Sequence, residues 1–78
     1  MKERSAEDDL AHQVAAELLR MRHELGLTQE QVARRMGASV SLVVGLEHAA
    51  HAPTGRTIER LSRALGARPE LRFVRYLE

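Results

Sequence analysis

Residues 28–48 read T-Q-E-Q-V-A-R-R-M-G-A-S-V-S-L-V-V-G-L-E-H, and this stretch predicts two short helices joined by a tight turn. Thr28 can begin the first helix, because its hydroxyl can accept a hydrogen bond from a backbone N–H group of the first turn. That helix is expected over residues 29–36. Gly37 is suited to a left-handed C-terminal cap, and Ser39 can begin a second helix that reaches the end of the stretch.

The side chains of this stretch divide into an inner and an outer set. Ala33 and Gly37 are small enough to let the two helices cross closely at a steep angle. The inner set is apolar and is expected to pack against the rest of the chain: Val32, Met36, Ala38, Val43 and Leu46. The outer set is expected to face away from the core: Ser39, Val40, Ser41, Val44 and Gly45.

Two further helices are expected on either side of this stretch. Ser5 has the spacing of a helix cap, and apolar residues at every third or fourth position then predict about five turns that end at Gly26. Beyond a loop, either Thr54 or Thr57 can begin a last helix that closes at Gly66. Its buried side is expected to consist of Ile58, Leu61 and Leu65. The sequence therefore predicts an all-α bundle of four to five helices in a single domain over residues 1–78.

The tail, residues 68–78, leaves two alternatives open. It is rich in strand-forming residues, yet Pro69 followed by Glu70 also suits the first turn of a helix. A lone strand would have to find a partner strand, most simply the same segment of a second copy. Four residues are expected to carry this dimerisation: Leu71, Phe73, Val74 and Tyr76.

Composition excludes several classes of function. The chain has 78 residues, no cysteine and only two aromatic residues, so a second domain, thiolate metal sites and stacking platforms for single-stranded nucleic acid are not expected. No catalytic set or phosphate-cradling glycine loop can be assembled, and we expect no enzyme activity, metal or cofactor. No segment suits a membrane, and a soluble cytoplasmic protein is expected. Residues 28–68 hold six arginines against three glutamates, so the middle of the chain is basic.

Residues 25–47, L-G-L-T-Q-E-Q-V-A-R-R-M-G-A-S-V-S-L-V-V-G-L-E, resemble the helix-turn-helix of the Xre, Cro and phage-repressor family, and the likeness covers about residues 18–67. The resemblance implies a lambda-repressor-like fold in which the third helix enters the major groove of double-stranded DNA. It also implies a buried ion pair between Arg22 and Glu47 and a phosphate contact from Gln29. Two copies would bind a near-palindromic operator.

This chain departs from the family on the outer face of the third helix, where arginine, glutamine or asparagine commonly read purine edges. The expected base-reading residues here are the short side chains Ser39, Val40, Ser41, Val44 and Gly45. The expected phosphate contacts are Thr28, Gln29, Arg34, Arg35 and Arg56. Direct reading of bases is therefore expected to be modest.

Two functions follow from this sequence. The first is a homodimeric, sequence-specific repressor or autoregulator, and the tail is similar to that of antitoxins of the HigA and HipB kind, which would imply a toxin as a protein partner. The alternative is a helix-turn-helix reused for protein binding, with an apolar docking surface formed by Val40, Leu42, Val43 and Val44.

Overall fold

The computed structural model describes residues 5–76, and these residues form four helices and no strand. The helices are α1 (Ala6–Glu24), α2 (Gln29–Met36), α3 (Val40–Glu47) and α4 (Gly55–Leu65). The all-α prediction is confirmed.

Every helix begins at a serine or threonine whose side-chain oxygen accepts a backbone N–H from the first turn. The four N-terminal caps are Ser5, Thr28, Ser39 and Thr54, with distances of 3.0 to 3.1 Å. At Thr28 the cap is reciprocal, because the backbone N–H of Thr28 also donates to Gln31 Oε1 at 2.8 Å. The choice between Thr54 and Thr57 is settled for Thr54, which accepts from the N–H of Thr57. Local sequence signals therefore set where each helix begins.

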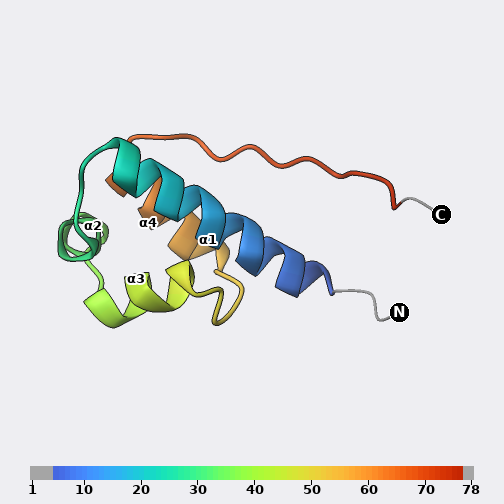
Figure 1. The fold of residues 1–78 in the computed structure, drawn as a ribbon, viewed down its shortest axis with the longest axis horizontal. Coiled ribbons are helices and arrows are strands. Elements are labelled where there is room, and N and C mark those ends of the chain that lie inside the picture. Colours follow the sequence, from blue (N-terminus) through green and yellow to red (C-terminus); the bar gives the residue numbers. More distant parts are fainter. Residues whose placement is uncertain (1–4, 77–78) are drawn as a thin grey trace.

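The four helices surround one small core. Figure 1 shows the long α1 crossing the molecule, with α2 seen nearly end-on beside its C-terminal end and α3 beneath it. Helix α3 packs on both α1 and α2, and α4 packs on α2. The largest fully buried side chains come from three helices: Leu18, Val32, Val43 and Leu46. Three positions expected to be buried are only half-buried: Ala38, Ile58 and Leu65.

The described part of the tail, residues 67–76, is neither strand nor helix. Figure 1 shows it leaving the end of α4 and running back beside α1 toward the N-terminus. The helical alternative is therefore not adopted, whereas the strand, which needs a second copy to pair with, stays a prediction. A strand has no neighbour to pair with here, and the β-branched and aromatic residues after Pro69 are poor helix formers. The last two residues of the expected tail lie outside the described residues.

Gly37 should be required for its conformation and not for its small size. Its φ is +67°, while a Cβ placed on it would meet nothing within 4 Å. We expect Gly37→Ala to lower the free energy of unfolding by about 1–2 kcal/mol, the cost of a left-handed alanine. Urea denaturation followed by far-UV circular dichroism measures this.

Gly55→Ala is the matched control, because Gly55 is equally open but its φ is not positive. Alanine suits a helix better than glycine, so this variant should unfold at the same or a higher urea concentration. An equal loss of stability in both variants would refute the conformational explanation.

Candidate functional site

The turn between α2 and α3 is three residues long and is held by backbone hydrogen bonds. The N–H of Gly37 donates to the carbonyl of Arg34 at 3.1 Å, and the N–H of Ala38 donates to the carbonyl of Ala33 at 2.9 Å. The hydroxyl of Ser39 then begins α3. The direction of α3 relative to α2 is therefore closely defined by the turn.

The exposed part of α3 is its first turn. Ser39, Val40 and Ser41 are all exposed, as expected. Val44 and Gly45 are half-buried, which corrects the expectation that they face outward. The loop after α3 covers this side, because a Cβ on Gly45 would lie 3.7 Å from His51 Cε1 and 3.9 Å from the Cβ of Ala50.

The apolar docking surface expected on α3 is not present in the form expected. Val43 has no exposed surface and belongs to the core. Leu42 and Val44 are half-buried, and Val40 alone of the four is exposed. The physical reason is the helical period, because four nearly consecutive residues of a helix cannot share one face.

A largely buried ion pair joins α1 to the end of α3. Arg22 Nε donates to Glu47 Oε2 at 2.6 Å, and Arg22 Nη2 donates to Glu47 Oε1 at 3.2 Å. The side chains are 13% and 5% exposed, respectively. Arg22 Nη1 also donates to the carbonyl of Leu27 at 3.0 Å, so the guanidinium holds the α1–α2 loop as well. The pair that the resemblance implies is present with two-pronged geometry.

The Glu47 carboxylate has a second partner, Gln29. The amide Nε2 of Gln29 donates to Glu47 Oε1 at 2.9 Å. Burial alone raises the pKa of Glu47, but the hydrogen bonds from Arg22 and Gln29 outweigh it, and the pKa lies below its ordinary value of 4.5. The hydrogen bond to Glu47 in turn raises the pKa of Arg22. Glu47 therefore stays ionised and connects three helices.

The expected phosphate contacts differ in how their side chains are engaged. The amide of Gln29 is turned toward Glu47, and the hydroxyl of Thr28 accepts the capping N–H of Gln31. Arg35 Nη1 donates to the carbonyl of Ala64 at 3.1 Å, so Arg35 caps the C-terminal end of α4.

Arg34 and Arg56 are the two expected phosphate contacts whose side chains remain open. Both are exposed, and neither makes an ion pair or hydrogen bond from its side chain to any residue in the range 5–76. They extend from α2 and from the first turn of α4, respectively. Two uncompensated guanidiniums therefore lie on separate helices.

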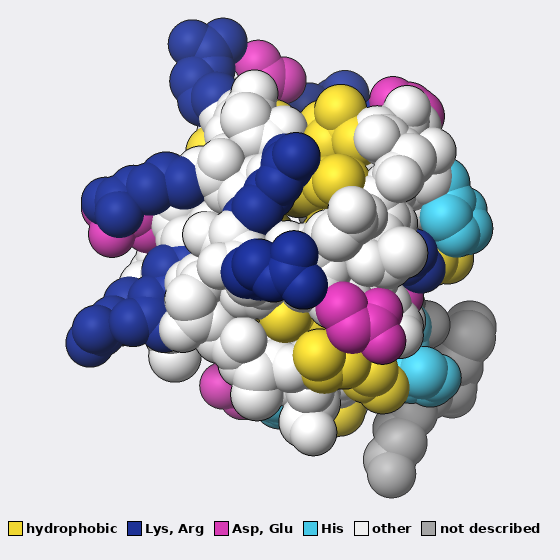
Figure 2. Space-filling model, turned by 90° about the vertical axis from the view of Figure 1, so that its left-hand side faces the viewer, with side chains coloured by type: hydrophobic (Ala, Val, Ile, Leu, Met, Phe, Trp, Pro, Cys, Tyr) yellow, Lys and Arg dark blue, Asp and Glu magenta, His cyan; other side chains and the backbone are white. Residues whose placement is uncertain are grey.

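The positive charge is gathered on α2 and α4. These helices together carry five arginines, and Arg63 is the one that pairs with an acid among residues 5–76, with Glu59 at 3.6 Å between exposed groups. Figure 2, which looks at the end of the molecule where α2 lies, shows Lys and Arg side chains spread over much of this face. Such a face attracts polyanions.

The four residues expected to mediate dimerisation are all exposed in the single chain. Leu71, Val74 and Tyr76 are each more than two-thirds exposed, and Phe73 is 93% exposed. They lie on the extended tail and make no part of the core.

Two roles in this region were not predicted from the sequence: the bond of Gln29 to Glu47 and the capping of α4 by Arg35. Both contacts join residues that are far apart along the chain, so no local sequence pattern predicts them. Within residues 5–76, no three His, Asp or Glu side chains lie close enough together to hold a metal ion. None of the described helices is long and apolar enough to span a bilayer.

Comparison with known proteins identifies a helix-turn-helix domain and relatives that are named as transcriptional regulators. A model of the family described as a helix-turn-helix domain matches residues 13–73. An uncharacterized HTH-type transcriptional regulator of Methanothermobacter thermautotrophicus (strain Delta H) is 42% identical over 45 residues, which cover 58% of this chain and 65% of that protein. The HTH-type regulator y4dJ of Sinorhizobium fredii (strain NGR234) is 40% identical over 58 residues, or 74% of this chain and 75% of its own length. The chain thus spans just under two thirds of the first relative.

A solved structure has the same fold. A mutant of the restriction-modification controller protein C.Esp1396I superposes with a TM-score of 0.71 at 24% identity, covering 76% of this chain and 75% of the other. The likeness shows that the arrangement of helices is shared.

Glu47→Gln should destabilise the fold at neutral pH by about 3 kcal/mol, because the variant leaves the buried guanidinium of Arg22 without its counter-charge. The effect should depend on pH. Since the folded pKa of Glu47 is below 4.5, the stabilisation is complete above about pH 5 and is lost as the pH falls through the folded pKa. Urea denaturation of the wild type and the variant between neutral and acid pH measures both effects.

Glu17→Gln is the control for Glu47, because Glu17 forms an ion pair with Arg20 on the exposed face of α1. Its removal should change stability far less. If the difference between wild type and Glu47→Gln is the same at all pH values, the charge of Glu47 is not what stabilises the fold.

Arg35→Ala should lower the free energy of unfolding by about 1 kcal/mol, through loss of the hydrogen bond and favourable charge at the end of α4. Arg34→Ala removes the neighbouring exposed guanidinium and serves as the control. Thermal denaturation compares the two, and equal midpoints would contradict the capping role of Arg35.

Proposed function

We propose that this chain, which belongs to the helix-turn-helix domain family of DNA-binding transcriptional regulators, acts as a homodimeric repressor of its own promoter. The observation that carries the proposal is the first turn of α3. It presents Ser39, Val40 and Ser41 to solvent from a helix whose direction is fixed by the turn at Gly37 and by the ion pair at its far end. A helix exposed and held in this way can enter a major groove.

The chemistry of this turn predicts a modest reading of bases. A serine hydroxyl can donate to or accept from a base edge, and Val40 can contact the methyl group of thymine. Neither can make the two-pronged contact that an arginine makes with guanine. Val44 and Gly45 are half-buried, so they would contact bases only if the major groove comes close to the helix. Specificity therefore depends strongly on the shape of the operator.

Phosphate binding falls to a smaller set of side chains than the sequence alone indicates. Arg34 and Arg56 are open and extend from α2 and α4, which pack on each other. Gln29 serves through its backbone N–H in the first turn of α2, where the helix dipole favours an anion, since its amide holds Glu47. Arg35 acts mainly by positioning α4.

Dimerisation through the tail completes the proposed regulator. We assign residues 28–48 to DNA recognition and residues 68–78 to the contact between copies, within one domain over residues 1–78. Two copies related by a two-fold axis would place their α3 helices about 34 Å apart, so the operator would be nearly palindromic.

An autoregulating antitoxin is the specific form of regulator that we favour, on the resemblance of residues 64–74 to antitoxin tails. Its partner would be a toxin encoded beside it. Co-expression with the product of the adjacent gene should then give a complex of fixed stoichiometry. Recovery of the regulator alone would leave a repressor without a toxin.

Two single variants test the assignment of DNA contacts. Arg56→Ala should weaken binding to every DNA sequence alike and lower the slope of log affinity against log salt by about one. Ser41→Ala should instead reduce the difference in binding affinity between the operator and a scrambled duplex. Fluorescence anisotropy against the chain's own promoter and the scramble, over a series of salt concentrations, measures both.

Glu59→Ala, which removes an exposed acid from the same helix as Arg56, is the control for a general change of charge. The wild type should prefer its promoter over the scramble by about 4 kcal/mol or more. Equal binding to both duplexes would exclude a sequence-specific regulator, and equal effects of the Arg56 and Ser41 variants would exclude α3 as the reader.

A further inference from the structure

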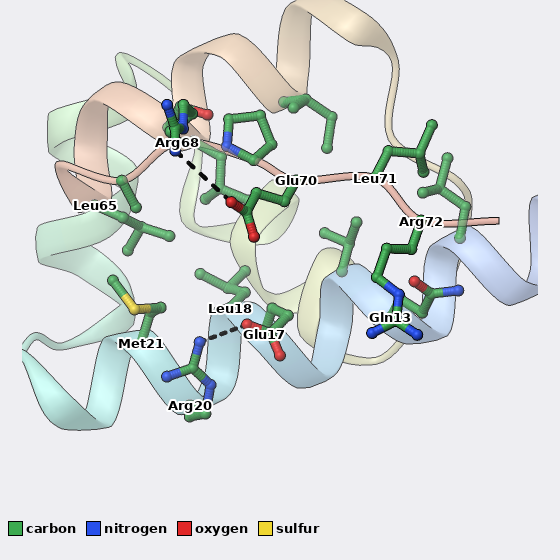
Figure 3. A pocket seen from close by; sticks show the side chains of 17 residues that line it. Gln13, Glu17, Leu18, Arg20, Met21, Leu65, Arg68, Glu70, Leu71 and Arg72 are labelled. Atoms are coloured by element: carbon green, nitrogen blue, oxygen red, sulfur yellow. Dashed lines mark hydrogen bonds and ion pairs between the residues drawn. The ribbon is translucent and has the colours of Figure 1, made fainter. Parts of the chain in front are cut away.

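An apolar groove of about 770 Å³ separates α1 from α4. Helix α1 packs mainly on α3, and α4 packs on α2, so the backbones of α1 and α4 make little direct contact, although Leu18, Leu61 and Ala64 belong to one core. Figure 3 shows side chains of both helices pointing into the space between them. Its aliphatic lining on the two helices consists of Leu10, Val14, Leu18, Met21, Ile58, Leu61 and Leu65, and the polar side chains Gln13, Glu17, Arg20 and Ser62 also line it. Ile58 and Leu65 remain half-buried for this reason.

The chain's own tail crosses this groove without filling it. Residues 67–72 lie along the opening, and Figure 3 shows Leu71 and Arg72 already at the end where Gln13 lies. Leu71 is still 68% exposed in this position. The apolar side chains from Phe73 onward are exposed and are not part of the lining, because they lie beyond the end of the groove.

Charge favours contact between this kind of tail and α1. Helix α1 has five acidic residues against two arginines, and the tail over residues 67–76 has three arginines against one glutamate. A basic extended segment is therefore matched to the acidic helix that forms one wall of the groove. The ten residues of the extended tail also have about the same length as the 19 residues of α1. An extended chain rises roughly 3.3 Å per residue, whereas a helix rises roughly 1.5 Å per residue.

We infer that in the homodimer each groove is occupied by the tail of the second copy, with the partner's Phe73 and the partner's Tyr76 inserted between α1 and α4. The inference rests on the proposed homodimer and names its interface. A single chain cannot make this contact, because its own aromatic residues lie beyond the end of the groove. A two-fold axis lets both tails exchange at once, so the contact closes on itself and stops at two copies.

This occupant accounts for two exposed apolar surfaces at once. The groove lacks large side chains to fill it, and the tail carries large side chains that nothing covers within residues 5–76. Burial of each in the other removes both surfaces from water.

Because the chain has no cysteine, single cysteines can report the exchange directly. Val14→Cys, within the groove, is mixed with Phe73→Cys, and the mixture is oxidised with diamide after the copies have exchanged. We expect the yield of mixed disulfide to be about tenfold higher than in the control pair. A difference of about 1.4 kcal/mol in the free energy of forming the contact corresponds to this ratio. The control pair is Ala16→Cys with Phe73→Cys, since Ala16 is exposed on α1 outside the groove.

Three results would overturn the inference. Phe73–Phe73 disulfides in excess of mixed ones would show tails paired with each other. An intramolecular disulfide in the Val14→Cys/Phe73→Cys double variant, without a mixed dimer, would show the tail closing its own groove. Equal yields in the groove and control pairs would show random collision.

A second variant separates the interface from folding. Phe73→Ser alters a side chain that is 93% exposed, so the monomer should keep its circular dichroism spectrum. Its dimer dissociation constant should rise about tenfold or more in sedimentation equilibrium, while Leu19→Ser, at an exposed leucine outside the groove, should leave it unchanged. An unchanged constant for Phe73→Ser refutes the inference.

DNA binding is measured separately, so that the two failures differ. Preferential binding to the promoter together with tail-to-tail disulfides would support the proposed repressor and reject the groove as the interface. Mixed disulfides without promoter preference would retain the groove and reject the repressor.

Discussion

The bond between Arg22 and Glu47 is the contact on which the arrangement of the helices depends. The guanidinium is attached to α1, touches the loop before α2 through the carbonyl of Leu27, and holds the end of α3 through the carboxylate. Gln29 brings the start of α2 to the same carboxylate. A small core cannot set the directions of three helices by apolar packing alone, since apolar contact is not directional. Hydrogen bonds to one nearly buried carboxylate are directional, and they hold α3 at its C-terminal end.

The small size of the core also explains why a groove is left open between α1 and α4. The buried residues gather between α1, α2 and α3 and along the inner side of α4, and six of the ten are no larger than valine. Little apolar mass is left to bring α1 and α4 together, so a groove remains between them. The tail has apolar side chains that could fill the groove, but they lie beyond its end. A second copy is the simplest source of what one chain leaves unfilled.

Charge is divided between the two sides of the molecule in a way that suits both proposed contacts. Helices α2 and α4 carry the arginines, and α1 carries most of the acids. DNA is expected on the basic side, next to the first turn of α3. The acidic helix α1 forms one wall of the groove in which a basic tail is proposed to bind. Attraction for phosphate and attraction between copies therefore do not compete for the same face.

Much of the secondary structure was determined by the sequence alone. Hydroxyl residues at Thr28 and Ser39 and a glycine at position 37 act on backbone groups within three or four residues, so their spacing sufficed to place α2, the turn and α3. The tertiary structure decided which side chains are available. Gln29 and Arg35 are turned toward Glu47 and Ala64, residues 18 and 29 positions away, and the loop after α3 half-covers Gly45. The tail was likewise undetermined, because a strand or a helix there depends on neighbours that residues 68–78 do not contain. Local hydrogen bonds are encoded by spacing, whereas contacts between distant segments exist only once the helices have packed.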